Sequence, residues 1–317
     1  MLKTLALMAV VSSLHGGEPN PQTAATPQQE QQSAPSTLED VIVDGRRLRE
    51  AVDDFVDEIV APPVNYGPAR WHRRVCVGAV NFRREVAQAL VDQVSSVAIR
   101  AGLEVGEPGC SPNILIMGTD DGSALARAMV ASNPRIFRPG YAGATLGSVA
   151  LERFRSTEDA VRWWHVSVPM TIDHNLIAVR LPGQQAPLVP QDGSRLTTRI
   201  RNDLAGVFIV LDINRAAGLS FQQIGDYIGM VAFAQVDPDA DTSTYDTVLN
   251  LFEAPPQSQP ALTEWDLSYL QALYGAELNQ RAVNQQSGEV SNSMFRDRQR
   301  AQPDDEEPPV EEPNPGP

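Results

Sequence analysis

The sequence has few of the residues and motifs from which common catalytic sites are built. Its 317 residues include only two cysteines and four histidines. No C-x-x-C pair is present, which disfavours a thiol oxidoreductase. The G-x-S-x-G elbow of serine hydrolases and the G-x-x-x-x-G-K-S/T loop that holds phosphate groups are also absent. These absences disfavour three common classes of enzyme.

Positive charge is also scarce. The chain carries 25 lysine and arginine residues against 40 aspartate and glutamate residues, which gives a formal net charge of -15 at pH 7. A surface with this charge repels the phosphates of nucleic acids and anionic lipid. We therefore expect no nucleic-acid partner.

The apolar run at the start of the chain is too short to cross a membrane comfortably. The stretch MLKTLALMAVVSSLHGG has a basic residue, Lys3, then an apolar segment from Thr4 to Val11, and then small residues. This order is typical of a cleaved signal peptide. We predict a signal peptide over residues 1–16, export to the periplasm or out of the cell, and no stable membrane span after cleavage.

The two cysteines, Cys76 and Cys110, form an even count, which in an exported chain indicates a disulfide. Each lies just before or inside a strand-like run, VCVGAV (75–80) and CSPNILIM (110–117), with a helix-like segment between them. We therefore predict that the two strands are neighbours and that a disulfide joins them where they begin. Two free buried thiols are the alternative.

The composition divides the chain into one folded region and two flanks. Residues 17–37 are rich in glutamine, proline and small residues, which bury too little apolar surface to fold. Residues 285–317 end in the acidic, proline-rich stretch PDDEEPPVEEPNPGP. We predict a disordered linker over 17–37, a globular domain over 38–284 and a disordered acidic tail over 285–317.

Apolar periodicity within the globular region predicts both helices and strands. Helices are expected over 48–59, 82–102, 225–238 and 262–275. Strand-like runs are DVIVDG (40–45), NILIMG (113–118), RWWHVSV (162–168), NLIAVRL (175–181) and LAGVFIVLD (204–212). Strands alternate with helices early in the chain, and helices dominate late. The expected fold class is α/β to α+β, a single domain with one mixed sheet and long helices.

The stretch GDYIGMVAFAQVDP (225–238) has the spacing of the metal-binding helix of zinc proteases. In the zincin class, two histidines one turn apart bind zinc, a glutamate between them activates water, and the metzincin branch extends the pattern to HExxHxxGxxH. Laid on that pattern, the stretch is GDxxGxxAxxQ. Gly225, Gly229 and Gln235 then occupy the histidine positions, and Asp226 occupies the glutamate position.

A second stretch, LTEWDLSYLQALYG (262–275), closely resembles the last helix of matrixin-like metalloproteases. The strand VFIVLD (207–212) fits the edge strand that precedes the zinc helix in that family, whereas TYDTVLNLF (244–252) lacks the methionine of the family's Met-turn. The C-terminal half therefore resembles a degenerate metzincin domain, which implies a zincin-like fold there. The folded region also resembles uncharacterised exported bacterial proteins that share these features.

The resemblance implies a scaffold whose zinc site has been lost. Glycine and glutamine do not replace imidazole as zinc ligands, so we expect no metal and no other cofactor. A cleft can survive the loss of its metal, and Gly225, Asp226, Gly229 and Gln235 are then its candidate ligand-binding residues. Core packing of an apolar helix is the alternative for the same stretch.

The protein is not expected to be an enzyme, because the residues that would bind zinc are missing from this helix. The candidates for a catalytic acid and base are Asp226, His165 and His174. The two histidines flank the stretch MTID and could meet Asp173 across a hairpin. Isolated histidines at the surface or at strand ends are the alternative.

Together these features predict a non-catalytic, exported, pseudo-metalloprotease-like protein that binds a peptide or protein partner in the cell envelope. The strand 204–212, beside the former cleft, is expected to pair with an extended peptide. An exposed tryptophan of the pair Trp163 and Trp164 would add a binding residue, and burial of both is the alternative. A hydrolase with an unrecognised site and a structural envelope protein are the alternative functions.

Overall fold

The computed structural model describes residues 38–60, 67–139, 146–180, 194–253 and 261–301. The predicted signal peptide (1–16), the predicted linker (17–37) and the last part of the predicted tail (302–317) lie outside these residues. The described residues all belong to one compact unit that begins at Leu38. No helix in these described ranges is both long enough and apolar enough to span a membrane.

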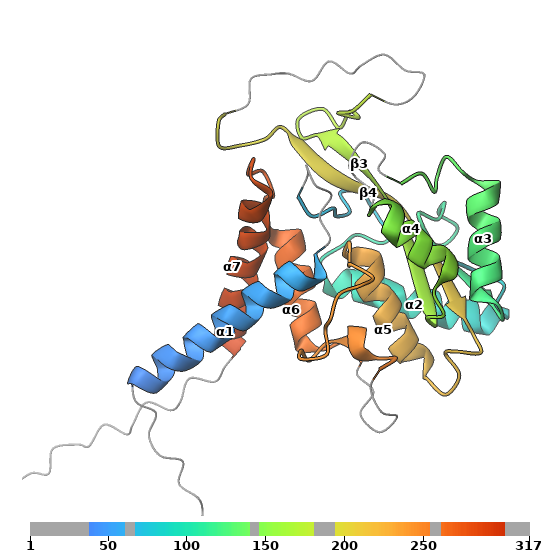
Figure 1. Cartoon of the computed structure of the whole chain (residues 1–317), viewed down its shortest axis with the longest axis horizontal. Helices are drawn as coiled ribbons and strands as arrows, with labels where there is room; N and C mark the ends of the chain where they lie inside the picture. The colour runs from blue at the N-terminus through green and yellow to red at the C-terminus, as the bar shows by residue number, and fades with distance from the viewer. Residues whose placement is uncertain (1–37, 61–66, 140–145, 181–193, 254–260, 302–317) are drawn as a thin grey trace, which may run out of the picture. The chain divides into compact units, whose positions relative to one another are not determined.

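One four-stranded sheet lies at the centre of the described residues (Figure 1). Its strands are β1 (Val77–Val80), β2 (Ile114–Thr119), β3 (Val161–Thr171) and β4 (Ile200–Asp212), and their order in the sheet is β1-β2-β4-β3. β1, β2 and β4 run parallel, and β3 runs antiparallel to β4. The predicted single domain with one mixed sheet is therefore confirmed.

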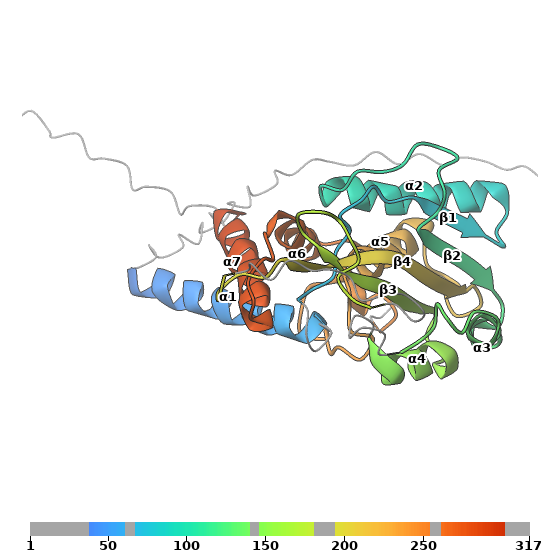
Figure 2. The same ribbon diagram turned by 90° about the horizontal axis from the view of Figure 1, so that it is seen from above.

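Helices cover both faces of the sheet (Figure 2). α2 (Arg84–Arg100) and α5 (Phe221–Phe233) pack against each other on one face. α3 (Gly122–Ser132) and α4 (Gly147–Ser156) pack against each other on the other face. The sheet is therefore the middle of three layers, and each face has its own hydrophobic cluster.

This layering explains why the central strands are apolar along their whole length. In β2, Ile116 lies in the cluster with α2 and α5, and the next residue, Met117, lies in the cluster with α3 and α4. In β4, Ile209 and Val210 divide between the two clusters in the same way. Successive side chains of a strand point to opposite faces, so a strand covered on both sides has no polar face.

A group of three helices packs beside the sheet (Figure 1). α7 (Val283–Ala301) packs against both α1 (Leu38–Ile59) and α6 (Glu264–Gly275). The buried side chains of all three helices join the larger hydrophobic cluster, which also contains α2 and α5. A short 3-10 helix, η2 (Val248–Asn250), lies between α5 and α6 in the chain.

Two of the predicted strands are wrong. Residues 40–45 lie inside α1, which begins at Leu38, and so they form no strand. Residues 175–180 form only one isolated bridge, between Ile177 and Met170. The chain has just turned there: Asn175 adopts a positive φ of 51°.

The predicted disordered tail begins too early. Residues 285–301, which were assigned to it, form most of α7, so the folded domain extends beyond residue 284. Val290 and Met294, one helical turn apart, are fully buried in the larger cluster, and Gln286 is buried one turn earlier. Few apolar residues pack this helix against the core. A pattern this sparse is hard to recognise in a polar sequence.

The prediction that strand 204–212 lies at a sheet edge is also wrong. β4 lies between β2 and β3, so both of its backbone edges are already paired. The edge strand next to β4 is β3. An extended peptide could therefore approach β3 but not β4.

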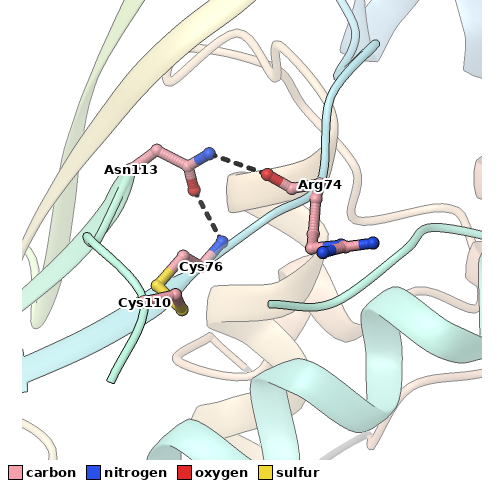
Figure 3. Close-up of a disulfide and its surroundings, with 4 residues drawn as sticks. All are labelled: Arg74, Cys76, Cys110 and Asn113. Carbon is pink, nitrogen blue, oxygen red and sulfur yellow. Dashed lines mark hydrogen bonds between the residues drawn. A yellow bond between two sulfur atoms is a disulfide. The ribbon is translucent and has the colours of Figure 1, made fainter. Parts of the chain in front are cut away.

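The predicted disulfide is confirmed (Figure 3). Cys76 and Cys110 are bonded, with their Cα atoms 6.1 Å apart, just before β1 and β2 begin. The side chain of Asn113 accepts a hydrogen bond from the backbone N–H of Cys76 at 2.8 Å and donates one to the carbonyl of Arg74 at 3.0 Å. β1 and β2 are neighbouring parallel strands, as the cysteine spacing predicts.

Candidate functional site

The helix that the sequence aligns with a zinc-binding helix is α5, and it is buried along most of its length. Ser220 and Gln223 form a capping box at its start. The ten residues from Ile224 to Phe233 are all buried. A helix covered on all sides is a core element. The buried helix therefore agrees with the alternative interpretation of this stretch, which is core packing.

Gly225 and Gly229 face α2 rather than a cleft. A Cβ atom placed on Gly225 would lie 2.5 Å from Cγ of Gln93, and one placed on Gly229 would lie 2.8 Å from Cβ of Val97. Either side chain would therefore overlap α2. The two glycines allow close contact between α2 and α5, and their predicted role in a ligand-binding cleft is wrong.

Asp226 has a structural position of the same kind. It is 1% exposed and accepts hydrogen bonds from Nε2 of Gln93 at 2.6 Å and from the backbone N–H of Leu262 at 3.1 Å. Its carboxylate thus joins α5 to α2 and to the chain that leads into α6. Gln235 is also buried, and its Nε2 donates to Oγ of Ser167 at 3.4 Å. The predicted cleft role of both residues is wrong as well.

The last carbonyl groups of α5 are capped by side chains from elsewhere in the fold. A helix leaves its final carbonyls without partners inside the helix. Here three buried or partly buried donors satisfy them: His165 to Val231 at 2.7 Å, Trp71 to Ala232 at 2.9 Å, and Tyr274 to Phe233 at 2.6 Å. These hydrogen bonds join the end of α5 to strand β3, to the segment before β1 and to helix α6.

The structure does not bring His165, His174 and Asp226 together. Burial lowers the pKa of His165 to about 4, so this histidine is neutral and acts as a cap. His174 is exposed in the turn after β3. Asp173, which was expected to meet the histidines, accepts instead from Arg199 at 2.5 Å. These three candidates therefore do not form an acid–base pair.

A pocket of about 580 Å³ lies at the start of β3, away from the predicted cleft residues. We call it the β3 pocket. Its lining comes from six parts of the chain: the end of α4 and the segment after it, the start of β3, the loop after β4, the middle of α5, and the segments 236–242 and 249–253. It therefore lies where the edge strand meets the chain that follows the core helix.

The lining of the β3 pocket is acidic. Six carboxylates line it against two guanidinium groups, a formal excess of four negative charges. Arg153 forms ion pairs with Asp159, at 3.2 Å, and with Asp239. Arg215 pairs with Glu158 at 2.9 Å. The remaining three carboxylates form no ion pair within the described part of the chain: Asp237, Asp241 and Glu253.

The lining of the β3 pocket also contains an aromatic cluster. Tyr227 of α5 packs edge-to-face against Phe252, with ring centroids 4.9 Å apart and an angle of 78° between the rings. Trp163 of β3 lies on the other side of Tyr227, at 6.3 Å and 67°. Nε1 of Trp163 donates to the carbonyl of Val236 at 3.3 Å, which holds the indole in place. Trp163 and Trp164 are both buried, on opposite faces of the sheet.

Sequence reasoning missed this pocket, although one signal was present. The stretch VDPDAD (236–241) places an aspartate at every second position directly after the core helix. A run of like charges in a loop is usually solvated, and the neighbouring sequence does not indicate that these aspartates share a pocket with aromatic side chains. The aromatic partners come from distant segments, so only the fold brings them to these aspartates.

The residues that the structure describes contain no group of three or more histidine, cysteine, aspartate or glutamate side chains arranged to hold a metal ion. Comparison of the chain with models of protein families, with curated proteins and with solved structures gives no match.

Proposed function

We propose that the protein is an exported, non-catalytic binding protein, and that its β3 pocket binds a positively charged segment of a peptide or protein partner in the cell envelope. The observation that carries this proposal is the charge of the pocket. Three of its carboxylates form no ion pair with any residue that the structure describes, and an aromatic cluster lines the same pocket. A ligand that has both a cationic group and an apolar stem matches both kinds of lining.

The location of the pocket supports a peptide ligand. Trp163 and Val161 belong to β3, the edge strand, and both line the pocket. A chain bound there would lie beside a strand that pairs through β4 on its other side. Electrostatic attraction between an acidic surface and a basic partner increases the rate of association and selects against acidic partners.

We also propose that the scaffold is metzincin-like. The chain runs from β4 into α5, then through η2 into α6, and an antiparallel strand lies beside β4. This order is what the resemblance of 225–238 and 262–275 requires. The proposal concerns the scaffold alone, because Gly225 and Gly229 contact α2.

Export forms part of the proposal through the signal-like residues 1–16, and the disulfide is of the kind that persists in an oxidising compartment. The mature protein from the exported fraction should begin near residue 17 on N-terminal sequencing. A chain that still begins at Met1 would contradict export.

Binding can be tested by calorimetric titration of the full-length protein with three ten-residue peptides that are basic, neutral or acidic but otherwise alike. We expect the basic peptide to bind and to lose at least about tenfold in affinity between low and high salt. The variant Asp237→Asn/Asp241→Asn/Glu253→Gln should weaken this binding by about tenfold or more. Each amide keeps the carbonyl oxygen that accepts the existing hydrogen bonds at Asp237 and Asp241.

A matched control removes the same charge elsewhere. Asp92, Glu104 and Glu107 are exposed acids outside the pocket, and their amide triple variant should bind the basic peptide like the unmodified protein. Equal binding of basic and acidic peptides, or equal losses in both triple variants, would contradict the proposed function.

A further inference from the structure

We infer that the group which enters the β3 pocket is an arginine side chain of the partner, bound through its guanidinium by the Tyr227 hydroxyl and an unpaired carboxylate. This inference rests on the proposed function and specifies its ligand. The cationic groups to compare are the planar guanidinium of arginine and the compact ammonium of lysine. Four observations favour arginine.

The first observation is an unused polar group inside the pocket. Tyr227 is only 8% exposed, and its hydroxyl makes no hydrogen bond with any described residue. Tyr227 lines the pocket together with the charged residues Asp159, Arg153 and Glu253. The hydroxyl is not among the fully buried polar atoms that lack a partner in the described part of the chain, so it is open to the pocket. A donor on a ligand can therefore reach it there.

The protonation of this hydroxyl suits a cationic donor. Burial raises the pKa of Tyr227, so the group remains a neutral phenol at physiological pH. A neutral phenol oxygen accepts an N–H while its own proton can be donated to a carboxylate on the pocket rim. Asp241 is held ionised, because hydrogen bonds from Ser243 lower its pKa.

The second observation is the arrangement of the rings. Tyr227 stands nearly perpendicular to Phe252, and Trp163 is tilted by 67° from Tyr227, so the three rings do not stack on one another. An aromatic face attracts a cation within about 6 Å of its centroid. A guanidinium is planar and weakly hydrated, so it can lie flat on such a face, whereas an ammonium keeps its water more strongly.

The third observation is the number of acceptors. Asp237, Asp241 and Glu253 lie on two separate segments and pair with no cation among the described residues, and the Tyr227 oxygen adds another acceptor. Arginine offers five N–H donors in a plane, and a carboxylate can take two of them side by side. Lysine offers three donors from one point, so it leaves more of these separated acceptors unsatisfied.

The fourth observation is that the pocket already contains pairs of this type. The guanidinium of Arg153 joins Asp159 and Asp239, which lie on different segments, and that of Arg215 contacts Glu158 at 2.9 Å. One pair of carboxylates in this pocket, Asp159 and Asp239, is therefore spaced so that a single guanidinium joins both. An incoming arginine would extend the same pattern to the unpaired acids.

The test uses the full-length protein and three acetylated, amidated pentapeptides that differ only at a central arginine, lysine or citrulline. Citrulline has nearly the shape of arginine but no charge. Calorimetric titration should give an affinity for the arginine peptide about tenfold higher than for the lysine peptide and higher still relative to citrulline. Tyr227→Phe should reduce arginine binding by about tenfold, while Tyr269→Phe, which removes a buried hydroxyl outside the pocket, should not.

The outcomes separate this inference from the proposed function. If arginine and lysine peptides bind equally and Tyr227→Phe has no effect, the inference is overturned and the proposed cation-binding function stands. If neither cationic peptide binds better than citrulline, both are overturned. The comparison of three peptides on the unmodified protein decides the question even if Tyr227→Phe fails to fold.

Discussion

At the scale of single residues, buried polar side chains in this protein hold helices to the chain around them. Asp266 is the clearest case, and it is the aspartate of the LTEWD stretch that resembles a metalloprotease helix. Its carboxylate accepts from the hydroxyl of Thr247 at 2.5 Å and from the backbone N–H groups of Val248 at 2.8 Å and Thr263 at 2.9 Å. The motif residue therefore ties the turn at η2 to the start of α6.

The pH dependence of stability should report on Asp266. Burial raises the pKa of Asp266 from 3.8 to about 6, although hydrogen bonds from Thr247, Thr263 and Val248 oppose the shift. The folded state then binds more protons than the unfolded state between these values. This residue's contribution to the free energy of unfolding is therefore greatest below pH 4 and falls as the pH rises to 6, by on the order of 2–3 kcal/mol.

Urea unfolding of the unmodified protein and of Asp266→Asn at pH 4, 5, 6 and 7 measures this effect. The asparagine variant lacks the titrating group, so the difference in unfolding free energy should change from pH 4 to pH 6 and become constant above that. A difference that is the same at all four pH values would show that Asp266 does not titrate in this range.

At the scale of secondary-structure elements, the contact between α2 and α5 depends on glycine. Gly225 and Gly229 lie one turn apart on α5, and a Cβ at either would overlap α2. Glycine in a helix interior costs about 1 kcal/mol relative to alanine. The fold accepts this cost because the two helices could not otherwise approach closely above the sheet.

Gly229→Ala should therefore destabilise the protein despite the better helix propensity of alanine. Its Cβ would lie 2.8 Å from Cβ and Cγ1 of Val97, and overpacking of this kind costs about 1–3 kcal/mol. Gly288→Ala in α7 is the matched control, because a Cβ there meets nothing within 4 Å. Chemical denaturation should show a lower free energy of unfolding for Gly229→Ala. For Gly288→Ala, the free energy of unfolding should stay the same or rise by up to about 1 kcal/mol. Equal effects in both variants would refute the close contact.

At the scale of the whole molecule, a covalent link and a shared core join distant parts of the chain. The disulfide Cys76–Cys110 closes a loop with a sequence separation of 34 around α2. The helices α1, α6 and α7 share their hydrophobic cluster with α2 and α5. The β3 pocket is lined by residues from six parts of the chain, between the end of α4 and the segment 249–253.

Removing the disulfide should destabilise the molecule chiefly by freeing the unfolded chain. For a loop of this length, chain entropy predicts that Cys76→Ser/Cys110→Ser costs about 3–4 kcal/mol. The denaturant m-value should rise as well, because the unfolded state becomes more expanded. A reducing agent should lower the free energy of unfolding of the unmodified protein and leave that of the double variant unchanged. A loss below about 1 kcal/mol would contradict the entropic account.

The sequence determined the elements whose signals are local. Continuous apolar runs identified β2 and β4, helical periodicity identified α2, and the two cysteines identified their own pairing. These predictions succeeded because strand and helix burial repeat every two or every three to four residues, which a short window of sequence contains. The signal was too sparse at α7, where Val290 and Met294 are the fully buried apolar residues and the other buried positions are polar.

Tertiary structure alone decided which strand lies at the edge and where the candidate site is. The position of β4 depends on the pairing of β3, and the direction in which Gly225 and Gly229 face depends on α2. The β3 pocket combines Tyr227, Trp163 and the aspartates after α5, which no sequence window contains together. Such sites arise from contacts between segments far apart in the chain, so the residues of one segment do not reveal what the other segments place opposite them.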